Sequence, residues 1–228
     1  MQNFNIIKNI NLPDTYRVKY IKSKFDFNDD KIELNLKLDN INLPIDWNMG
    51  VIVGNSGSGK STIAKEIYKI DNFIYSSSAV IDDMPKNITN NEIIETFNKV
   101  GFSSPPSWLK PYNILSNGEK MRVDLANSIL SDKDIIAFDE FTSVLDRNVA
   151  KIASYSIQKY IRKYNKKFVA ISCHFDIIEW LEPDWILNTN TMDFYMGTKS
   201  PITKDLPLKL KFINAQLTNG NYLGNIII

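Results

Sequence analysis

The stretch GNSGSGKST, residues 54–62, constrains this chain more than any other part of its sequence. Its glycines allow tight turns that bring backbone N–H groups close to a bound anion. The apolar run GVIVG before it (50–54) is typical of a buried strand, and residues 61–70 after it form a predicted helix. A strand, a glycine-rich loop and a helix in this order predict a phosphate-binding loop, with the phosphate held at the positive end of the helix.

Every position of this loop is a candidate contact for a nucleoside triphosphate. Lys60 is expected to reach the β- and γ-phosphates, and the Ser61 hydroxyl is expected to bind Mg²⁺. The alternative, a glycine-rich turn without a ligand, leaves the complete motif and its strand–helix context unexplained. The predicted ATP contacts are Gly54, Asn55, Ser56, Gly57, Ser58, Gly59, Lys60, Ser61 and Thr62.

A pair of carboxylates ends a second buried strand, IIAFDE (135–140). Ligands of α/β proteins bind at the carboxyl ends of the strands. Asp139 is therefore expected to hold Mg²⁺, directly or through water, and Glu140 to polarise the water that attacks the γ-phosphate. Acidic residues that merely cap a strand are the alternative, and the phosphate-binding loop upstream favours the catalytic interpretation.

A capped helix start, LSNGEK (115–120), lies shortly before that strand. Ser116 and Glu119 have the spacing of a capping box, and the helix is predicted over 116–130. Its free N–H groups and positive dipole end suit the γ-phosphate of a nucleotide that another subunit holds. Taken alone, the stretch is explained as well by an ordinary capping box.

Two further stretches follow, SVLD (143–146) and ISCH (171–174), and the second ends in the only histidine of the chain. In chain order, GNSGSGKST, LSNGE, IIAFDE, SVLD and ISCH resemble the Walker A, signature, Walker B, D-loop and switch-histidine motifs of the ATP-binding cassette (ABC) ATPases. The resemblance spans residues 54–174. It implies an ATPase that uses ATP and Mg²⁺, with Lys60, Glu140 and His174 as its catalytic residues.

The resemblance also assigns residues to a homodimer that forms around ATP. Ser116, Asn117 and Gly118 would contact the γ-phosphate bound to the partner subunit, although the family usually has LSGGQ where this chain has LSNGE. Asp146 would lie at the dimer seam. His174 would hold the γ-phosphate within its own subunit and help to align the water.

Two family features have weaker counterparts in this chain. The family stacks an aromatic residue on adenine, and Phe25 and Phe27 are the candidates, with core packing as the alternative for both. The family also places a metal-sensing glutamine between Walker A and the signature, and this chain has none there. AVIDDMP (79–85) occupies the expected position. Asp82 or Asp83 would offer an oxygen to the metal, and loop acids without function are the alternative.

The element pattern predicts an α/β fold: a P-loop core with a parallel sheet, an N-terminal antiparallel β region and a reduced helical subdomain that carries the signature stretch. The whole chain, 1–228, is expected to be a single ABC ATPase domain. Its core is expected over 50–78 and 131–190, its helical subdomain over 79–130 and a C-terminal extension of unknown role over 191–228. The elements predicted elsewhere are strands over 15–27, 31–38, 134–140 and 167–172, helices over 89–100 and 148–164, a short helix within 174–187, and a proline-punctuated loop over 103–111.

The composition excludes several classes of protein. The chain has one cysteine, one histidine and a formal net charge of +1. These values oppose a disulfide framework and a His/Cys metal centre, and they leave no global field that would recruit nucleic acid or anionic lipid. The sequence also has no apolar run of about 18 residues, the length that spans a bilayer. A cytoplasmic location is therefore expected.

Three functions remain in competition. The first is a cytosolic ABC ATPase that acts on nucleic acid or a protein partner, the second is the ATPase subunit of a membrane transporter, and the third is a P-loop kinase. The kinase alternative does not account for the motifs that follow the phosphate-binding loop. Segment 61–115 is short for the subdomain that binds a transporter's membrane partner, and the coupling glutamine is missing, so the first function is favoured. DWNMGVIVGNSGSGKS (46–61) and CHFDIIEWLEPDWIL (173–187) also resemble small ABC ATPases of bacteria and phages.

Overall fold

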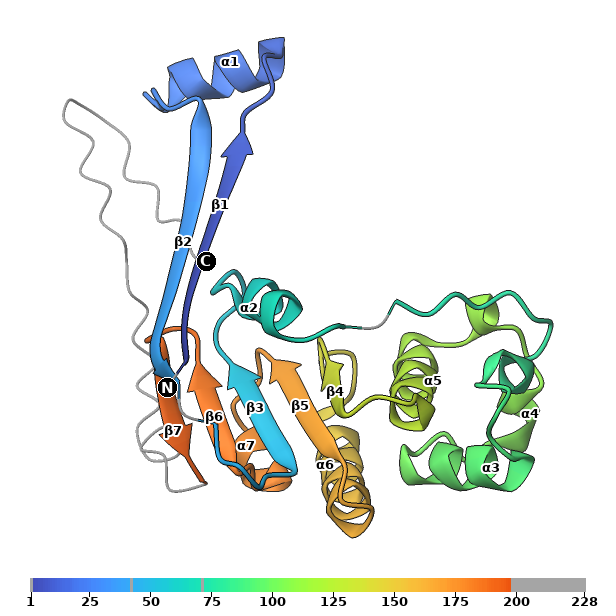
Figure 1. The fold of residues 1–228 in the computed structure, drawn as a ribbon. Helices are drawn as coiled ribbons and strands as arrows, with labels where there is room; N and C mark the ends of the chain where they lie inside the picture. The colour runs from blue at the N-terminus through green and yellow to red at the C-terminus, as the bar shows by residue number, and fades with distance from the viewer. Residues whose placement is uncertain (1, 42, 71, 198–228) are drawn as a thin grey trace.

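The computed structural model describes residues 2–41, 43–70 and 72–197, and it has the predicted α/β fold (Figure 1). Its centre is a five-stranded sheet in the order β4-β5-β3-β6-β7. β7 pairs antiparallel with β6, and the other pairings are parallel. The strands are β3 (Met49–Val53), β4 (Ile135–Phe138), β5 (Lys167–Ser172), β6 (Trp185–Asn188) and β7 (Asp193–Met196).

Helices cover both faces of this sheet. On one face, α2 (Lys60–Ile67) packs in the same apolar cluster as Ile52 of β3. On the other face, α6 (Arg147–Lys163) and α7 (Ile177–Leu181) share a cluster with Val51. Because successive residues of a strand point to opposite faces, a strand that is buried on both faces reads as the continuous apolar run seen in the sequence.

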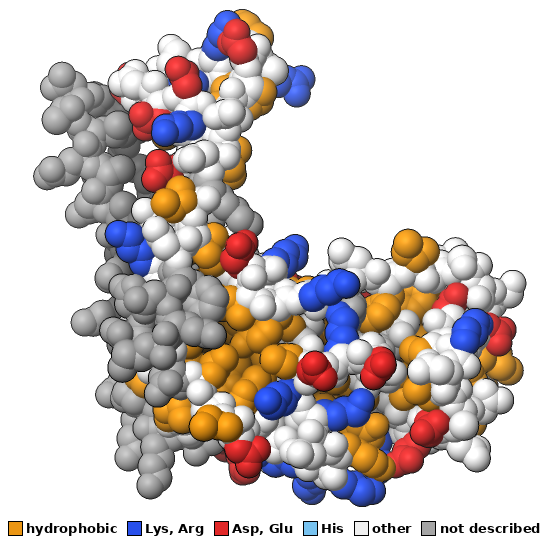
Figure 2. Space-filling model, viewed as in Figure 1, with side chains coloured by type: hydrophobic (Ala, Val, Ile, Leu, Met, Phe, Trp, Pro, Cys, Tyr) orange, Lys and Arg blue, Asp and Glu red, His pale blue; other side chains and the backbone are white. Residues whose placement is uncertain are grey.

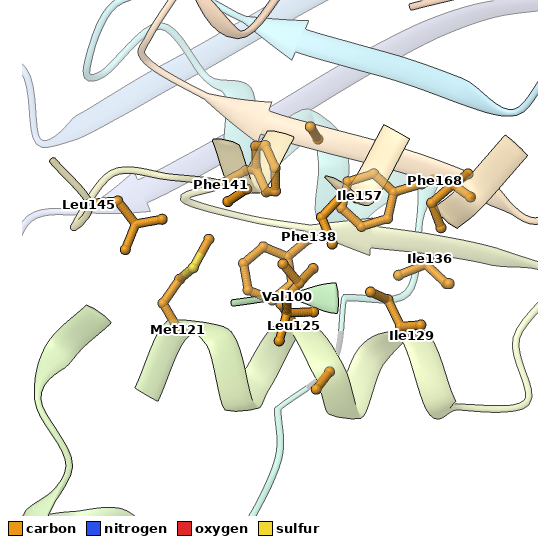
Figure 3. Packing of buried hydrophobic residues seen from close by; sticks show 14 of the residues in the cluster. Val100, Met121, Leu125, Ile129, Ile136, Phe138, Phe141, Leu145, Ile157 and Phe168 are labelled. Atoms are coloured by element: carbon orange, nitrogen blue, oxygen red, sulfur yellow. The ribbon is translucent and has the colours of Figure 1, made fainter. Parts of the chain in front are cut away.

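A helical region lies beside β4. It consists of η1 (Val80–Asp83), α3 (Asn90–Lys99), α4 (Pro105–Trp108), η2 (Tyr112–Ile114) and α5 (Asn117–Leu130). Both α3 and α5 begin with the predicted capping boxes. Figure 3 shows Leu125 and Ile129 of α5 among Ile136 and Phe138 of β4, so α5 joins this region to the core through apolar packing.

The N-terminal residues form a projecting arm. β1 (Gln2–Asn11) and β2 (Lys31–Ile41) pair antiparallel, and α1 (Tyr16–Lys24) connects them at the far end. We call residues 2–41 the arm. In Figure 2 the arm stands away from the body, and α1 has no buried residue. The predicted antiparallel β region is therefore present, as a single two-stranded ribbon in the described residues.

Helix α1 shows that the predicted strand over 15–27 is wrong. The Thr15 hydroxyl accepts a hydrogen bond from the Val18 N–H (3.3 Å) and caps the helix. The Lys22 ammonium, in the last turn, pairs with the Asp30 carboxylate at 2.6 Å. No buried surface exists here for an alternating strand to cover, so local capping and charge decide the conformation.

The loop predicted over 103–111 is wrong in part, because it contains the single turn α4. Prolines fit the first helical turn, where their missing N–H has no intrahelical partner to lose. The other predicted elements are confirmed, although α2 ends at Ile67, earlier than predicted. Of the expected extension 191–228, the described part holds β7, and residues 198–228 lie outside the described ranges. Among the helices that the structure describes, none is both long and apolar enough to cross a bilayer.

Candidate nucleotide-binding site

The glycine-rich loop runs from the end of β3 to the first residue of α2. Gly57 and Gly59 have φ angles of 80° and 89°, which lie in the left-handed region that glycine adopts without strain. Gly54 is required for a different reason, since a Cβ atom there would lie 2.1 Å from the Thr189 hydroxyl oxygen. Glycine is thus needed at all three positions, twice for its backbone angle and once for its size.

Lys60 places a positive charge inside this loop. Only 7% of its surface is exposed, and its ammonium donates a hydrogen bond to the Asn55 carbonyl (2.7 Å). A buried ammonium is costly unless polar or anionic groups surround it. At the N-terminus of a helix, where backbone N–H groups are free, such a charge favours a bound polyphosphate.

A pocket of about 370 Å³ opens beside the loop. It brings the loop and the start of α2 together with Glu140, from the end of β4, and Cys173, from the end of β5. Sequence reasoning did not select Cys173, although it lies in the ISCH stretch. The lining residues are Ser56, Gly57, Gly59, Lys60, Ser61, Thr62, Glu140 and Cys173.

Glu140 is held in an unusual conformation. Its φ of 55° is in the left-handed region, which costs a non-glycine residue about 1–3 kcal/mol. Its backbone N–H donates to the Asp139 carboxylate (2.9 Å), and its own carboxylate accepts from the Ser143 hydroxyl (2.6 Å). The next residue, Phe141, donates its N–H to the Ile171 carbonyl (2.9 Å), which ties the turn to β5. These contacts fix the direction in which Glu140 leaves the sheet.

Asp139 lines a second pocket, of about 350 Å³, and not the loop pocket. Tyr75 and Tyr112 stack in this second pocket with their ring centroids 3.9 Å apart. The Tyr112 hydroxyl donates to the Asp124 carboxylate (2.8 Å), and burial raises the pKa of Asp124 above its usual range. The structure therefore puts the two acids of IIAFDE on different pockets.

The signature residues lie at the exposed start of α5. Ser116 caps the helix, and its N–H donates to the Glu119 carboxylate (2.9 Å). That hydrogen bond, together with one from the Ser107 hydroxyl, holds the pKa of Glu119 below its usual range. Neither Ser116 nor its neighbours Asn117 and Gly118 line the loop pocket, so one subunit does not bring the two motifs together.

Asp146 and His174 stand at the ends of two other elements. Asp146 caps α6 by accepting the Asn148 N–H at 2.9 Å. His174 lies two residues after the end of β5, is half-buried, and donates its backbone N–H to the Ser172 hydroxyl (3.2 Å). Its neighbour Cys173 lines the loop pocket, whereas His174 itself does not.

Three predicted site residues lie elsewhere. Phe25, at the end of α1, and Phe27 are 60% and 39% exposed, at the far end of the arm from the body (Figure 1). Asp82 is exposed on η1 and does not line the loop pocket. The structure brings none of the three to the glycine-rich loop. Asp83 has a local task instead, because its carboxylate accepts the Ser77 N–H (3.0 Å).

The donor set fits a magnesium ion that is bound together with phosphate. In the described part of the chain, no three His, Cys, Asp or Glu side chains gather as a protein-only metal site. Mg²⁺ takes few protein ligands and completes its shell with substrate phosphates and water. The Ser61 hydroxyl and the carboxylates of Asp139 and Glu140 are oxygen donors of this kind.

Fold and site together define a class of protein. The chain is an α/β protein whose glycine-rich loop joins a central parallel strand to a helix, with a buried lysine in the loop and a carboxylate across the pocket. This is the arrangement of the P-loop nucleotide-binding proteins.

Comparisons with known proteins narrow that class. No protein-family model matches the chain. It is 27% identical over 205 residues to the mRNA export factor elf1 of Schizosaccharomyces pombe, covering 75% of this chain but only 19% of elf1. It is also 25% identical over 194 residues to the energy-coupling factor transporter ATP-binding protein EcfA1 of Staphylococcus aureus, covering 66% of this chain and 71% of EcfA1.

Two solved structures share the fold. The ATP-binding cassette MJ0796, in a dimeric post-hydrolysis state with ADP and Pi, has a TM-score of 0.55 at 17% identity, over 80% of this chain and 94% of MJ0796. A bacterial Atm1-family ABC exporter with ATP bound has a TM-score of 0.51 at 19% identity, over 62% of this chain and 32% of the exporter. The chain has the fold of an ABC-type ATPase cassette, and its sequence has distant homology to transporter ATP-binding proteins and to elf1.

Proposed function

We propose that this chain binds and hydrolyses ATP with Mg²⁺. The observation that carries the proposal is the loop pocket, which combines the buried Lys60, the Ser61 hydroxyl and the carboxylate of Glu140. Lys60 and the N-terminus of α2 bind the phosphates, and Ser61 holds the ion, which Asp139 would reach through water from the second pocket. Bound Mg²⁺ would neutralise charge on the phosphates, and Glu140 orients the attacking water.

We further propose that two copies close around two nucleotides. Ser116, Asn117 and Gly118 are displayed at the start of α5 but do not reach the loop pocket of their own subunit. A two-fold axis lets each copy supply this helix end to the other, which completes both sites in one interface. The dimeric state of MJ0796 supports this arrangement.

The role that we propose is a cytoplasmic switch that acts on nucleic acid or on a protein partner. The short segment 61–115 and the absence of a glutamine within it support this role over that of a transporter subunit. The likeness to EcfA1 keeps the transporter alternative open, and stoichiometric purification with a multi-spanning membrane protein would establish that alternative. The likeness to elf1, an mRNA export factor, favours a partner other than a membrane pore.

ATP turnover tests the site. Lys60→Ala removes the buried cation and is expected to lower the hydrolysis rate by about 10²–10³, the usual loss for one preorganised donor. Lys69→Ala is the matched control, because Lys69 is an exposed lysine just after the same helix and lines neither the loop pocket nor the second pocket. Phosphate release by the purified proteins is the measurement. Equal rates for Lys60→Ala and the unmodified protein would refute the site.

A further inference from the structure

We propose that Thr189 and Asn190, in the turn after β6, are positioning residues that set the shape of the phosphate-binding loop. The inference rests on the nucleotide site proposed above. Both residues lie more than 120 positions along the chain from the loop, yet the parallel pairing of Val53 with Asn188 brings the end of β6 level with the start of the loop. The turn is thus a neighbour of the loop across the sheet.

The side chain of Asn190 fixes one peptide of the loop. Its Oδ1 accepts the N–H of Asn55 at 2.8 Å. The carbonyl of Asn55 in turn accepts the Lys60 ammonium (2.7 Å) and the Ser58 N–H (3.2 Å). The orientation of the Asn55 peptide therefore decides where the Lys60 ammonium lies. Asn190 controls that orientation from outside the loop.

Thr189 fixes the floor of the loop. It is 3% exposed, and both its N–H (2.8 Å) and its hydroxyl (3.2 Å) contact the Val53 carbonyl. Its oxygen also lies 2.5 Å from the Ser58 hydroxyl. Either hydroxyl can be the donor in this short contact. The Ser58 side chain is thereby held against the turn after β6, and Ser58 does not line the loop pocket.

Close packing makes the contact rigid. A Cβ atom on Gly54 would lie 2.1 Å from Thr189 Oγ1 and 3.2 Å from Asn190 Oδ1, so the loop rests directly on the turn. The turn is itself braced, since the Asn190 N–H donates to the Asn188 side chain (3.0 Å). A loop that is held in its binding shape before the ligand arrives avoids the ordering cost on binding. The structure assigns that task to Thr189 and Asn190.

Amide hydrogen exchange of the nucleotide-free protein tests the first contact. Asn190→Ala removes the acceptor for Asn55, and we expect exchange in residues 54–58 to become at least about fivefold faster. Asn190→Asp puts a carboxylate oxygen where the amide oxygen accepts the Asn55 N–H, and it is expected to retain the slow exchange. Unchanged exchange in Asn190→Ala would overturn the role of Asn190.

Nucleotide affinity tests the second contact. Thr189→Val keeps the shape of the side chain but leaves the Ser58 hydroxyl without its partner. We expect the Kd for a fluorescent ATP analogue, and the KM for ATP, to rise about tenfold, with kcat changed less than about twofold. Thr189→Ser, which keeps the hydroxyl, should restore both values. Thr191→Val is the matched control, because the exposed Thr191 belongs to the same turn and does not line the loop pocket.

The outcomes separate this inference from the proposed function. If the unmodified protein binds the analogue and Thr189→Val binds it equally well, the positioning role of Thr189 is wrong and the ATP site stands. A loss that Thr191→Val shares, or that follows a matching fall in Tm, would make the effect one of stability and would also overturn the role. If the unmodified protein binds no better than Lys60→Ala, the proposed function fails. The exchange experiment still decides whether the turn orders the loop.

Discussion

Asp124 shows how a single half-buried acid makes the stability of this fold depend on pH. Its carboxylate accepts the Tyr112 hydroxyl in the second pocket, and burial raises its pKa. A carboxyl whose pKa is raised on folding binds its proton more tightly in the folded state than in the unfolded state. Its contribution to stability is therefore largest at low pH and declines as the pH rises through the folded-state pKa.

Replacing Asp124 by asparagine should remove this loss of stability with rising pH. Asparagine still offers an oxygen to Tyr112 but carries no charge to bury. The Tm of Asp124→Asn minus that of the unmodified protein is expected to increase from about pH 4, near the ordinary pKa of an aspartate, to about pH 8, because only the unmodified protein loses this contribution as the pH rises. Asp134→Asn, at an exposed aspartate, is the control. A Tm difference that is constant over this range would contradict the prediction.

Single residues also mark the limit of what the sequence could predict. The role of Lys60 follows from its position in a local motif, because the loop and the helix that it starts are contiguous in the chain. Thr189 and Asn190 belong to no motif, and they meet the loop only because β6 pairs beside β3. Contacts between distant segments depend on strand order, which local patterns do not specify.

Among the elements, α5 carries most of the connection between the helical region and the sheet. Its N-terminus displays the signature residues to solvent, while its middle is buried against β4 (Figure 3). The direction of the signature end is thus set by the apolar packing of the same helix. A change in that packing should move the signature residues as well as lower stability.

Leu125→Ala is expected to lower the free energy of unfolding by about 2–5 kcal/mol, because Leu125 is fully buried and the space that it leaves cannot close completely. Urea denaturation followed by circular dichroism measures the loss. Ile114→Ala provides the comparison, since Ile114 is 63% exposed and its removal should cost little. Similar losses in both variants would show that α5 is not packed as described.

The predicted elements were correct where a buried face or a cap defined them. The buried strands and the capped helices α3 and α5 are present. The strand over 15–27 was wrong because α1 has no face to bury, so alternation there carries no information about packing. The sequence also could not predict that the arm projects from the body, because local patterns do not show which other elements β1 and β2 pack against.

At the scale of the whole molecule, the loop pocket lies apart from the signature residues at the start of α5, and this separation has a consequence for assembly. Glu140→Gln keeps the size of the side chain but removes most of its basicity, so bound ATP should persist. We expect this variant to be monomeric without nucleotide and dimeric with ATP and Mg²⁺, because ATP becomes part of the interface. Size exclusion coupled to light scattering measures the change in mass.

Adding Ser116→Arg to Glu140→Gln provides the matched variant. A bulky cation at the start of α5 should prevent the dimer while each monomer still binds ATP, because Ser116 does not line the loop pocket of its own subunit. A Glu140→Gln protein that stays monomeric at saturating ATP would exclude the homodimer. It would indicate instead that a different chain supplies the second signature.

The arm meets the glycine-rich loop at Gly59. A Cβ atom on Gly59 would lie 2.7 Å from Leu36 Cδ1, so β2 rests on the N-cap residue of α2. Leu36 is buried there, although the far end of the arm is exposed. Positions 36 and 59 are therefore not free to vary independently during evolution. A lineage that enlarges the side chain at 36, or replaces the glycine at 59, must also move the end of the side chain that β2 presents to the loop.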